Sequence, residues 1–125
     1  MAELLRADLR PQPNSVRAAR QAVRLELSEH GLEGLADTAM LLTSELVTNA
    51  VRHARTRFGL WLDWNSERVR IEVEDDSPEP LHPKPESRDQ PGGLGLRLLA
   101  TMASRWGFQH EQGNGKVVWF ELDTA

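Results

Sequence analysis

The spacing of apolar residues changes along the chain, and this change constrains the fold more than any other feature. In residues 14–54 apolar side chains recur at every third or fourth position, which predicts two amphipathic helices separated near Gly31. In residues 58–73 apolar side chains recur at every second position on either side of a turn at Asn65-Ser66. Alternation around such a turn is typical of a β-hairpin.

The remaining segments complete a two-layer arrangement. We expect a short strand over residues 4–9, a third helix from Leu94 to about Arg105, and a closing hairpin over residues 106–122. Helices and antiparallel hairpins are therefore segregated along the chain, which is typical of α+β proteins. The predicted fold is a two-layer α/β sandwich, in which helices pack on one face of a mixed, mostly antiparallel sheet.

Length and composition limit the classes of function. A chain of 125 residues is expected to form a single domain, residues 1–125. It contains no cysteine, which excludes disulfides, thiolate metal sites and a cysteine nucleophile. The formal net charge of -4 argues against direct contact with nucleic acid. Because the sequence has neither an apolar run long enough to span a bilayer nor a signal peptide, we expect a cytoplasmic protein with no membrane partner.

Polar residues form a row on the second predicted helix. Glu45, Asn49 and His53 are spaced four positions apart, so they share one face of an α-helix. Such a row is most often solvated surface. Here it lies beside the apolar positions Leu46 and Ala50, and a buried asparagine amide needs a partner. A Mg²⁺ ion is one suitable partner, because it prefers oxygen ligands.

Asp75 ends the second strand of the first hairpin. Period-two alternation places it on the same side of the sheet as Ile71 and Val73, facing the helices. One interpretation is an aspartate that caps the turn before Ser77-Pro78. The other is an acceptor for a ligand donor, such as the exocyclic amine of adenine.

A proline-rich segment and a glycine cluster follow Asp75. Prolines at five positions between 78 and 91 predict a long loop, and loops of this length are often lids or binding segments. The loop ends in Gly92-Gly93-Leu94-Gly95-Leu96 at a predicted helix start. A short glycine cluster is more often a hinge or a tight turn than a nucleotide site. The free amides of a helix N-terminus nevertheless suit a phosphate group.

Taken in order, these motifs resemble the ATP-binding boxes of the GHKL superfamily. Residues 45–54 are similar to the N box, residues 73–78 to the G1 box, and residues 93–96 to the G2 box. A more specific likeness is to the single-domain anti-sigma-factor serine/threonine kinases and related small actinobacterial regulators. The G1 box differs from the family pattern at one point, because Ser77 and Glu79 stand where glycines are usual.

The resemblance implies roles for individual residues. Asn49 would ligate the Mg²⁺ ion bound to ATP, and Glu45 would orient or deprotonate the attacking hydroxyl group. Asp75 would accept a hydrogen bond from the adenine amine. The backbone of Gly93, Leu94, Gly95 and Leu96 would bind the phosphates, and His53 would belong to the same nucleotide site.

The resemblance also implies a function. It indicates a protein kinase that uses ATP and Mg²⁺, phosphorylates a small anti-sigma-factor antagonist and binds a sigma factor, with residues 77–92 as the ATP lid. A homodimer is compatible with this function. The alternative is a non-catalytic module that sequesters a partner, with or without nucleotide. An ATPase without a protein substrate is a third interpretation.

Overall fold

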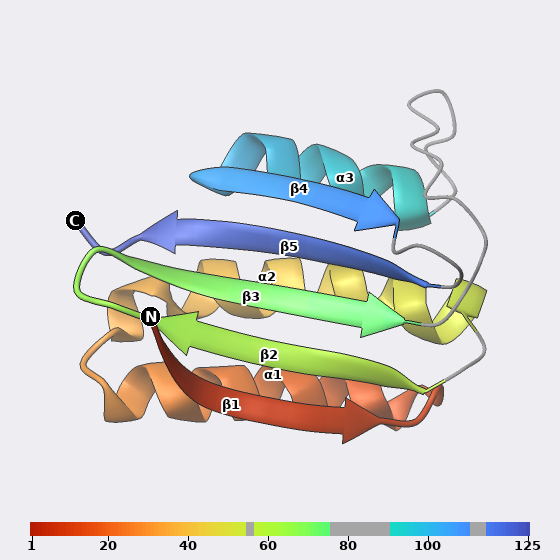
Figure 1. Ribbon diagram of the computed structural model, residues 1–125, viewed down its shortest axis with the longest axis horizontal. Helices are drawn as coiled ribbons and strands as arrows, with labels where there is room; N and C mark the ends of the chain where they lie inside the picture. Colours follow the sequence, from red (N-terminus) through yellow and green to blue (C-terminus); the bar gives the residue numbers. More distant parts are fainter. Residues whose placement is uncertain (55–56, 76–90, 111–114) are drawn as a thin grey trace.

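One five-stranded sheet forms the front layer of the computed structural model, in the order β1-β2-β3-β5-β4 (Figure 1). The structure describes residues 1–54, 57–75, 91–110 and 115–125, and of these the side chains of 53–54, 91–96 and 110 are not described. The strands are β1 (Ala2–Leu9), β2 (Phe58–Trp64), β3 (Arg68–Asp75), β4 (Arg105–His110) and β5 (Lys116–Asp123). Each neighbouring pair is antiparallel, so the sheet that we expected to be mixed is antiparallel throughout the described strands.

The helices form the second layer and cover one face of the sheet (Figure 1). They are α1 (Asn14–Glu29), α2 (Glu33–Asn49), which continues into a π-helical turn η1 (Ala50–Ala54), and α3 (Pro91–Met102). Helix α2 contacts both α1 and α3. The predicted two-layer α+β sandwich is therefore confirmed. In the described part of the chain, no helix combines the length and apolar character needed to cross a membrane.

The break between the first two helices is confirmed at Gly31. This residue has a φ of 71°, a left-handed conformation that glycine adopts without strain. Its amide donates to the Ser28 carbonyl at 3.3 Å, and the Leu32 amide donates to the Leu27 carbonyl at 2.8 Å. These two hydrogen bonds form a Schellman motif, which satisfies carbonyls at the end of α1 and turns the chain toward α2.

Alternation along the strands explains where the core lies. Apart from Asp75 and Lys116 at one end of the sheet, the inward side chains of β2, β3 and β5 are apolar, and most of them are fully or almost fully buried against the helices. Their outward neighbours are mostly charged, as expected for an antiparallel sheet with one solvated face. The inward set from these strands comprises Phe58, Leu60, Leu62, Val69, Ile71, Val73, Val118, Phe120 and Leu122.

The open face of the sheet contains an ion-pair network centred on Glu121. Its carboxylate accepts hydrogen bonds from Arg105 at 2.7 Å and from Arg70 at 3.1 Å. Burial of Glu121 opposes its ionisation, but the hydrogen bonds from Arg105 and Arg70 outweigh burial and lower its pKa. The Arg70 guanidinium also lies over the Trp119 ring, 4.0 Å from its centroid. This network joins β3, β4 and β5 on the side of the sheet that no described helix covers.

Candidate functional site

The elements that carry the three predicted boxes meet at one end of the molecule. The end of β3, the start of β5, the turn η1 and the start of α3 all lie at the right-hand side of Figure 1. Contacts between β3 and η1, and between α2 and α3, confirm that these elements are packed together. The fold therefore gathers segments that are far apart in the sequence, as a composite nucleotide site requires.

Asn49 ends α2 with an unsatisfied side-chain acceptor. Its Oδ1 atom is buried, and no donor from the described residues lies within hydrogen-bonding distance. A buried amide oxygen without a partner costs free energy, so its presence needs an explanation. One explanation is that Oδ1 is a ligand for Mg²⁺, because Mg²⁺ binds through one or two protein oxygens together with substrate phosphates and water. The donor type and the burial of Asn49 thus fit the predicted metal role.

Glu45 lies one helical turn before Asn49, as the four-residue spacing predicted. Its side chain is half-buried in α2. Burial raises the pKa of its carboxyl group above the ordinary value, because the charged form is less well solvated. A raised pKa makes the carboxylate a better proton acceptor near neutral pH. Glu45 is therefore a candidate general base beside a candidate metal ligand.

The predicted row of three residues does not continue as a regular α-helix to His53. After Asn49 the backbone changes to η1, in which hydrogen bonds run from residue i to i+5. The four-residue spacing that relates Glu45 to Asn49 therefore does not apply across η1. The His53 side chain lies outside the described residues, so its role stays a prediction. Turns of this kind are frequent at functional sites.

Asp75 lies where the alternation placed it, at the end of β3 on the face covered by helices. It is 5% exposed, which is unusual for an aspartate. The strand register pairs it with Phe58 of β2 on one side and with Lys116 of β5 on the other. The Lys116 ammonium lies 3.7 Å from Asp75 Oδ2, and Lys116 is also 5% exposed. Asp75 is thus part of a buried ion pair.

Lys116 is a site residue that we did not predict. Alternation along β5 puts Lys116 on the same face as Val118 and Phe120. The sequence feature that could have indicated its role is a lysine at the inward position of a strand start. The sequence does not reveal that β5 pairs with β3, because the two strands are separated by the loop, α3 and β4.

The glycine cluster lies inside a helix rather than before it. Helix α3 begins at Pro91, so Gly92, Gly93 and Gly95 belong to its first turns, and it ends at Met102 instead of near Arg105. Proline is favoured in the first turn of a helix, where its missing amide costs no hydrogen bond. The amides that follow Pro91 are those that a helix N-terminus leaves without intrahelical partners. Phosphate binding by residues 93–96 stays a prediction, because their side chains lie outside the described residues. Residues 77–90 of the expected lid also lie outside the description, whereas the expectation that the lid extends to residue 92 is wrong, because Pro91 and Gly92 belong to α3.

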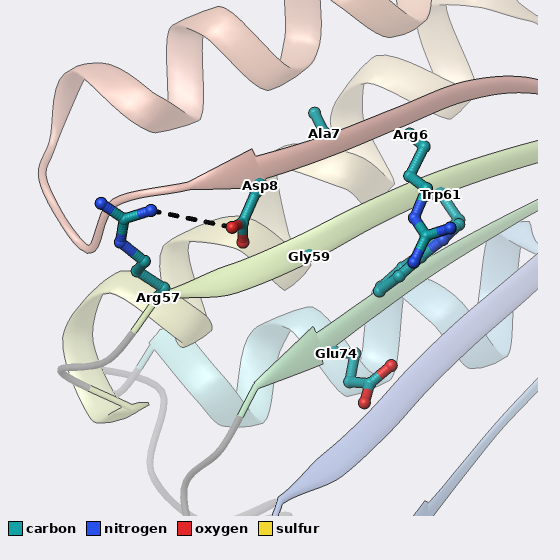
Figure 2. Close-up of a pocket in the computed structure, with 7 residues that line it drawn as sticks. All are labelled: Arg6, Ala7, Asp8, Arg57, Gly59, Trp61 and Glu74. Atoms are coloured by element: carbon teal, nitrogen blue, oxygen red, sulfur yellow. Dashed lines mark ion pairs between the residues drawn. The ribbon is translucent and has the colours of Figure 1, made fainter.

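A separate hollow lies on the open face of the sheet (Figure 2). Arg57 and Asp8 form an exposed ion pair at its rim, with 3.7 Å between Nη1 and Oδ2. Arg6 lies over the Trp61 ring, 5.5 Å from its centroid. The lining residues are Arg6, Ala7, Asp8, Arg57, Gly59, Trp61 and Glu74. None of the predicted nucleotide-site residues lines this hollow, and Asp75 faces the opposite layer.

Comparison with known proteins agrees with the site. No curated protein matches the chain significantly. A profile described as the histidine kinase-like ATPase domain matches residues 9–122, which include the helices, strands β2 to β4, nearly all of β5 and each of the three boxes. Because this match covers most of the chain, the chain belongs to the family of histidine kinase-like ATPase domains, of the GHKL type.

Proposed function

We propose that this chain is an ATP-binding regulatory protein that acts as an anti-sigma-factor serine/threonine kinase. Membership of the ATPase-domain family supports ATP binding. The observation that carries the proposal is the buried Oδ1 atom of Asn49, which has no hydrogen-bond donor among the described residues and lies one helical turn from Glu45. A family match describes the fold, whereas this pair of side chains supports the chemistry at the site.

The proposed reaction assigns one task to each side chain. The γ-phosphoryl group of bound Mg·ATP would pass to the substrate hydroxyl oxygen while its bond to the β-phosphate oxygen breaks and ADP leaves, and the bound metal would neutralise charge on the phosphates. Asn49 would hold that metal through Oδ1, and the backbone amides at the start of α3 would hold phosphate oxygens. Glu45 would accept the proton of the attacking serine or threonine hydroxyl at its carboxylate. Asp75 would accept a hydrogen bond from the adenine amine.

The proposed partners follow from the sequence resemblance. The phosphoryl acceptor would be a small anti-sigma-factor antagonist, and the chain would also bind a sigma factor. A homodimer is part of the same proposal. Asp75 and Glu45 belong to one end of the molecule, so partner contacts elsewhere on the surface would leave the nucleotide site accessible.

A specific observation favours a second candidate function. The base-recognition residue Asp75 is already ion-paired with Lys116, and the G1 box has Ser77 and Glu79 in place of glycines. Both features favour a module that sequesters a partner without using nucleotide. This candidate and the kinase differ in what they require of ATP, which makes them experimentally separable.

Calorimetry of the full chain with Mg·ATP, followed by a transfer assay, tests the proposal. For the kinase we expect saturable binding that requires Mg²⁺, and transfer of γ-phosphate label to an antagonist protein. Gln21→Ala, at an exposed position of α1, is the matched control and should bind as the wild type does. Capture of a sigma factor with no detectable nucleotide binding would replace the kinase by the sequestering module.

A further inference from the structure

The buried pair formed by Asp75 and Lys116 has a geometry that bears on nucleotide affinity. The two residues are direct cross-strand partners in the β3–β5 register, and each is 5% exposed. Their charged atoms, Asp75 Oδ2 and Lys116 Nζ, are 3.7 Å apart. Lysine is almost never this buried unless it is paired, and the Asp75 carboxylate is one such partner.

The surroundings make this pairing hard to give up. Phe58, on the other side of Asp75, is 1% exposed, and Val73 and Val118 precede and follow the pair on the same face of the sheet. An ammonium group in such an apolar setting is costly unless a counter-charge stays next to it. The backbone of Lys116 is also held at the start of β5 by its pairing with Asp75 in β3.

The ammonium lies beside the carboxylate that a nucleobase amine would approach. At 3.7 Å from Asp75 Oδ2 it forms an ion pair with the carboxylate, and unlike the base it is charged and belongs to the chain. A neutral amine interacts more weakly with a carboxylate than a charged group does. A base that arrives at Asp75 must therefore displace the lysine or bind a carboxylate whose charge is already neutralised.

We propose that Lys116 occupies the base-recognition position of Asp75 and thereby lowers the affinity of this site for ATP. The inference rests on the proposed function, because it takes Asp75 as the residue that binds adenine. Lys116 is then the residue that determines how strongly the chain depends on nucleotide. Replacing Lys116 by an uncharged residue should strengthen ATP binding. If Lys116 instead bound the nucleotide directly, the same replacement would weaken ATP binding.

Three variants test this inference by direct titration with Mg·ATP. Lys116→Met keeps the length of the side chain without its charge, and we expect it to bind Mg·ATP about 10- to 100-fold more tightly than the wild type, the factor for one hydrogen bond to a charged group. Lys116→Arg keeps the charge and should bind as weakly as the wild type. Asp75→Val combined with Lys116→Met replaces the pair by apolar side chains, which proteins often tolerate, and should not show the gain.

The outcomes separate this inference from the proposed function. If the wild type binds Mg·ATP and Lys116→Met binds with equal or lower affinity, the inference is wrong and the proposed function stands. The inference also fails if the double variant binds as tightly as Lys116→Met, since the gain would not act through Asp75. If neither the wild type nor Lys116→Met binds Mg·ATP, the inference and the proposed function are both overturned.

Folding of the single variant needs its own check. Lys116→Met leaves the Asp75 carboxylate buried without its cation, which destabilises the fold. Circular dichroism reports whether the variant is folded. If it is not, Lys116→Thr serves the same test, because threonine suits a strand and its hydroxyl can donate to Asp75 without adding charge. The same gain in affinity is expected, and its absence would refute the inference.

Discussion

Replacing Asn49 by alanine should stabilise the nucleotide-free protein and remove its response to Mg·ATP. The buried Oδ1 atom has no donor among the described residues, and an unsatisfied buried acceptor costs about 1–3 kcal/mol. Alanine also has the higher helix propensity, by roughly 0.5 kcal/mol. Alanine also loses the packing contacts of the half-buried asparagine side chain, which costs about 0.8 kcal/mol for each buried methylene equivalent. This cost offsets part of the gain in stability. The net expectation is a gain of about 1–2 kcal/mol in the free energy of unfolding.

Urea denaturation with and without Mg·ATP measures both effects in one experiment. At a ligand concentration of about 100 times Kd, the wild type should gain about 2.7 kcal/mol from binding, and Asn49→Ala should gain almost nothing. The control Gln21→Ala changes an exposed helical residue, so its unfolding free energy should differ by less than about 0.5 kcal/mol and its response to Mg·ATP should persist. A loss of more than about 1 kcal/mol in Asn49→Ala would mean that Asn49 makes hydrogen bonds that support the fold. An undiminished response to Mg·ATP would remove Asn49 from the nucleotide site.

Three further predictions concern Glu45 and Glu121. Glu45→Gln keeps the size of the side chain but cannot accept a proton, so phosphoryl transfer should fall by about 10²–10⁴-fold with Mg·ATP binding retained, and wild-type turnover would assign the base elsewhere. Because burial raises the Glu45 pKa, the transfer rate should decline on acidification with a midpoint above its ordinary value of 4.5, and a pH-rate profile measures this midpoint. Glu121→Gln should lower the free energy of unfolding at neutral pH, because it weakens the bonds from Arg70 and Arg105. The lowered pKa of Glu121 gives stability that is present above its ordinary value of 4.5 and lost as the pH falls through the folded-state pKa, so the effect of Glu121→Gln should vanish in strongly acidic urea titrations.

The local patterns in the sequence were enough to predict the layers. The alternation from Phe58 to Val73 gave both strands of the first hairpin, and its inward residues are buried as expected. The break at Gly31 was predictable because glycine adopts the left-handed conformation that a Schellman motif requires. The inward position of Asp75 followed from the same period of two. These features depend on neighbours within a few residues, which a single sequence contains.

Features that depend on long-range pairing or helix irregularity were not predictable in the same way. The turn from α2 into η1 changes the hydrogen-bonding period after Asn49, and no proline or glycine between Asn49 and Ala54 signals it. The start of α3 at Pro91 was missed because the glycines after it disfavour a helix, and tertiary contacts between α3 and α2 outweigh that local preference.

The most consequential omission, Lys116, shows why a functional motif is incomplete without its strand partners. The sequence left Asp75 as either a turn cap or an acceptor for a ligand donor, and the family resemblance implied that it binds the adenine amine. The register then brought an ammonium from β5 to 3.7 Å, and this contact supplies the counter-charge within the protein itself. The buried Oδ1 atom of Asn49, by contrast, has no hydrogen-bond donor within the part of the chain that the structure describes. One end of the site is therefore electrostatically compensated without ligand and the other is not, so we expect the metal and phosphates to contribute more to nucleotide affinity than the base does.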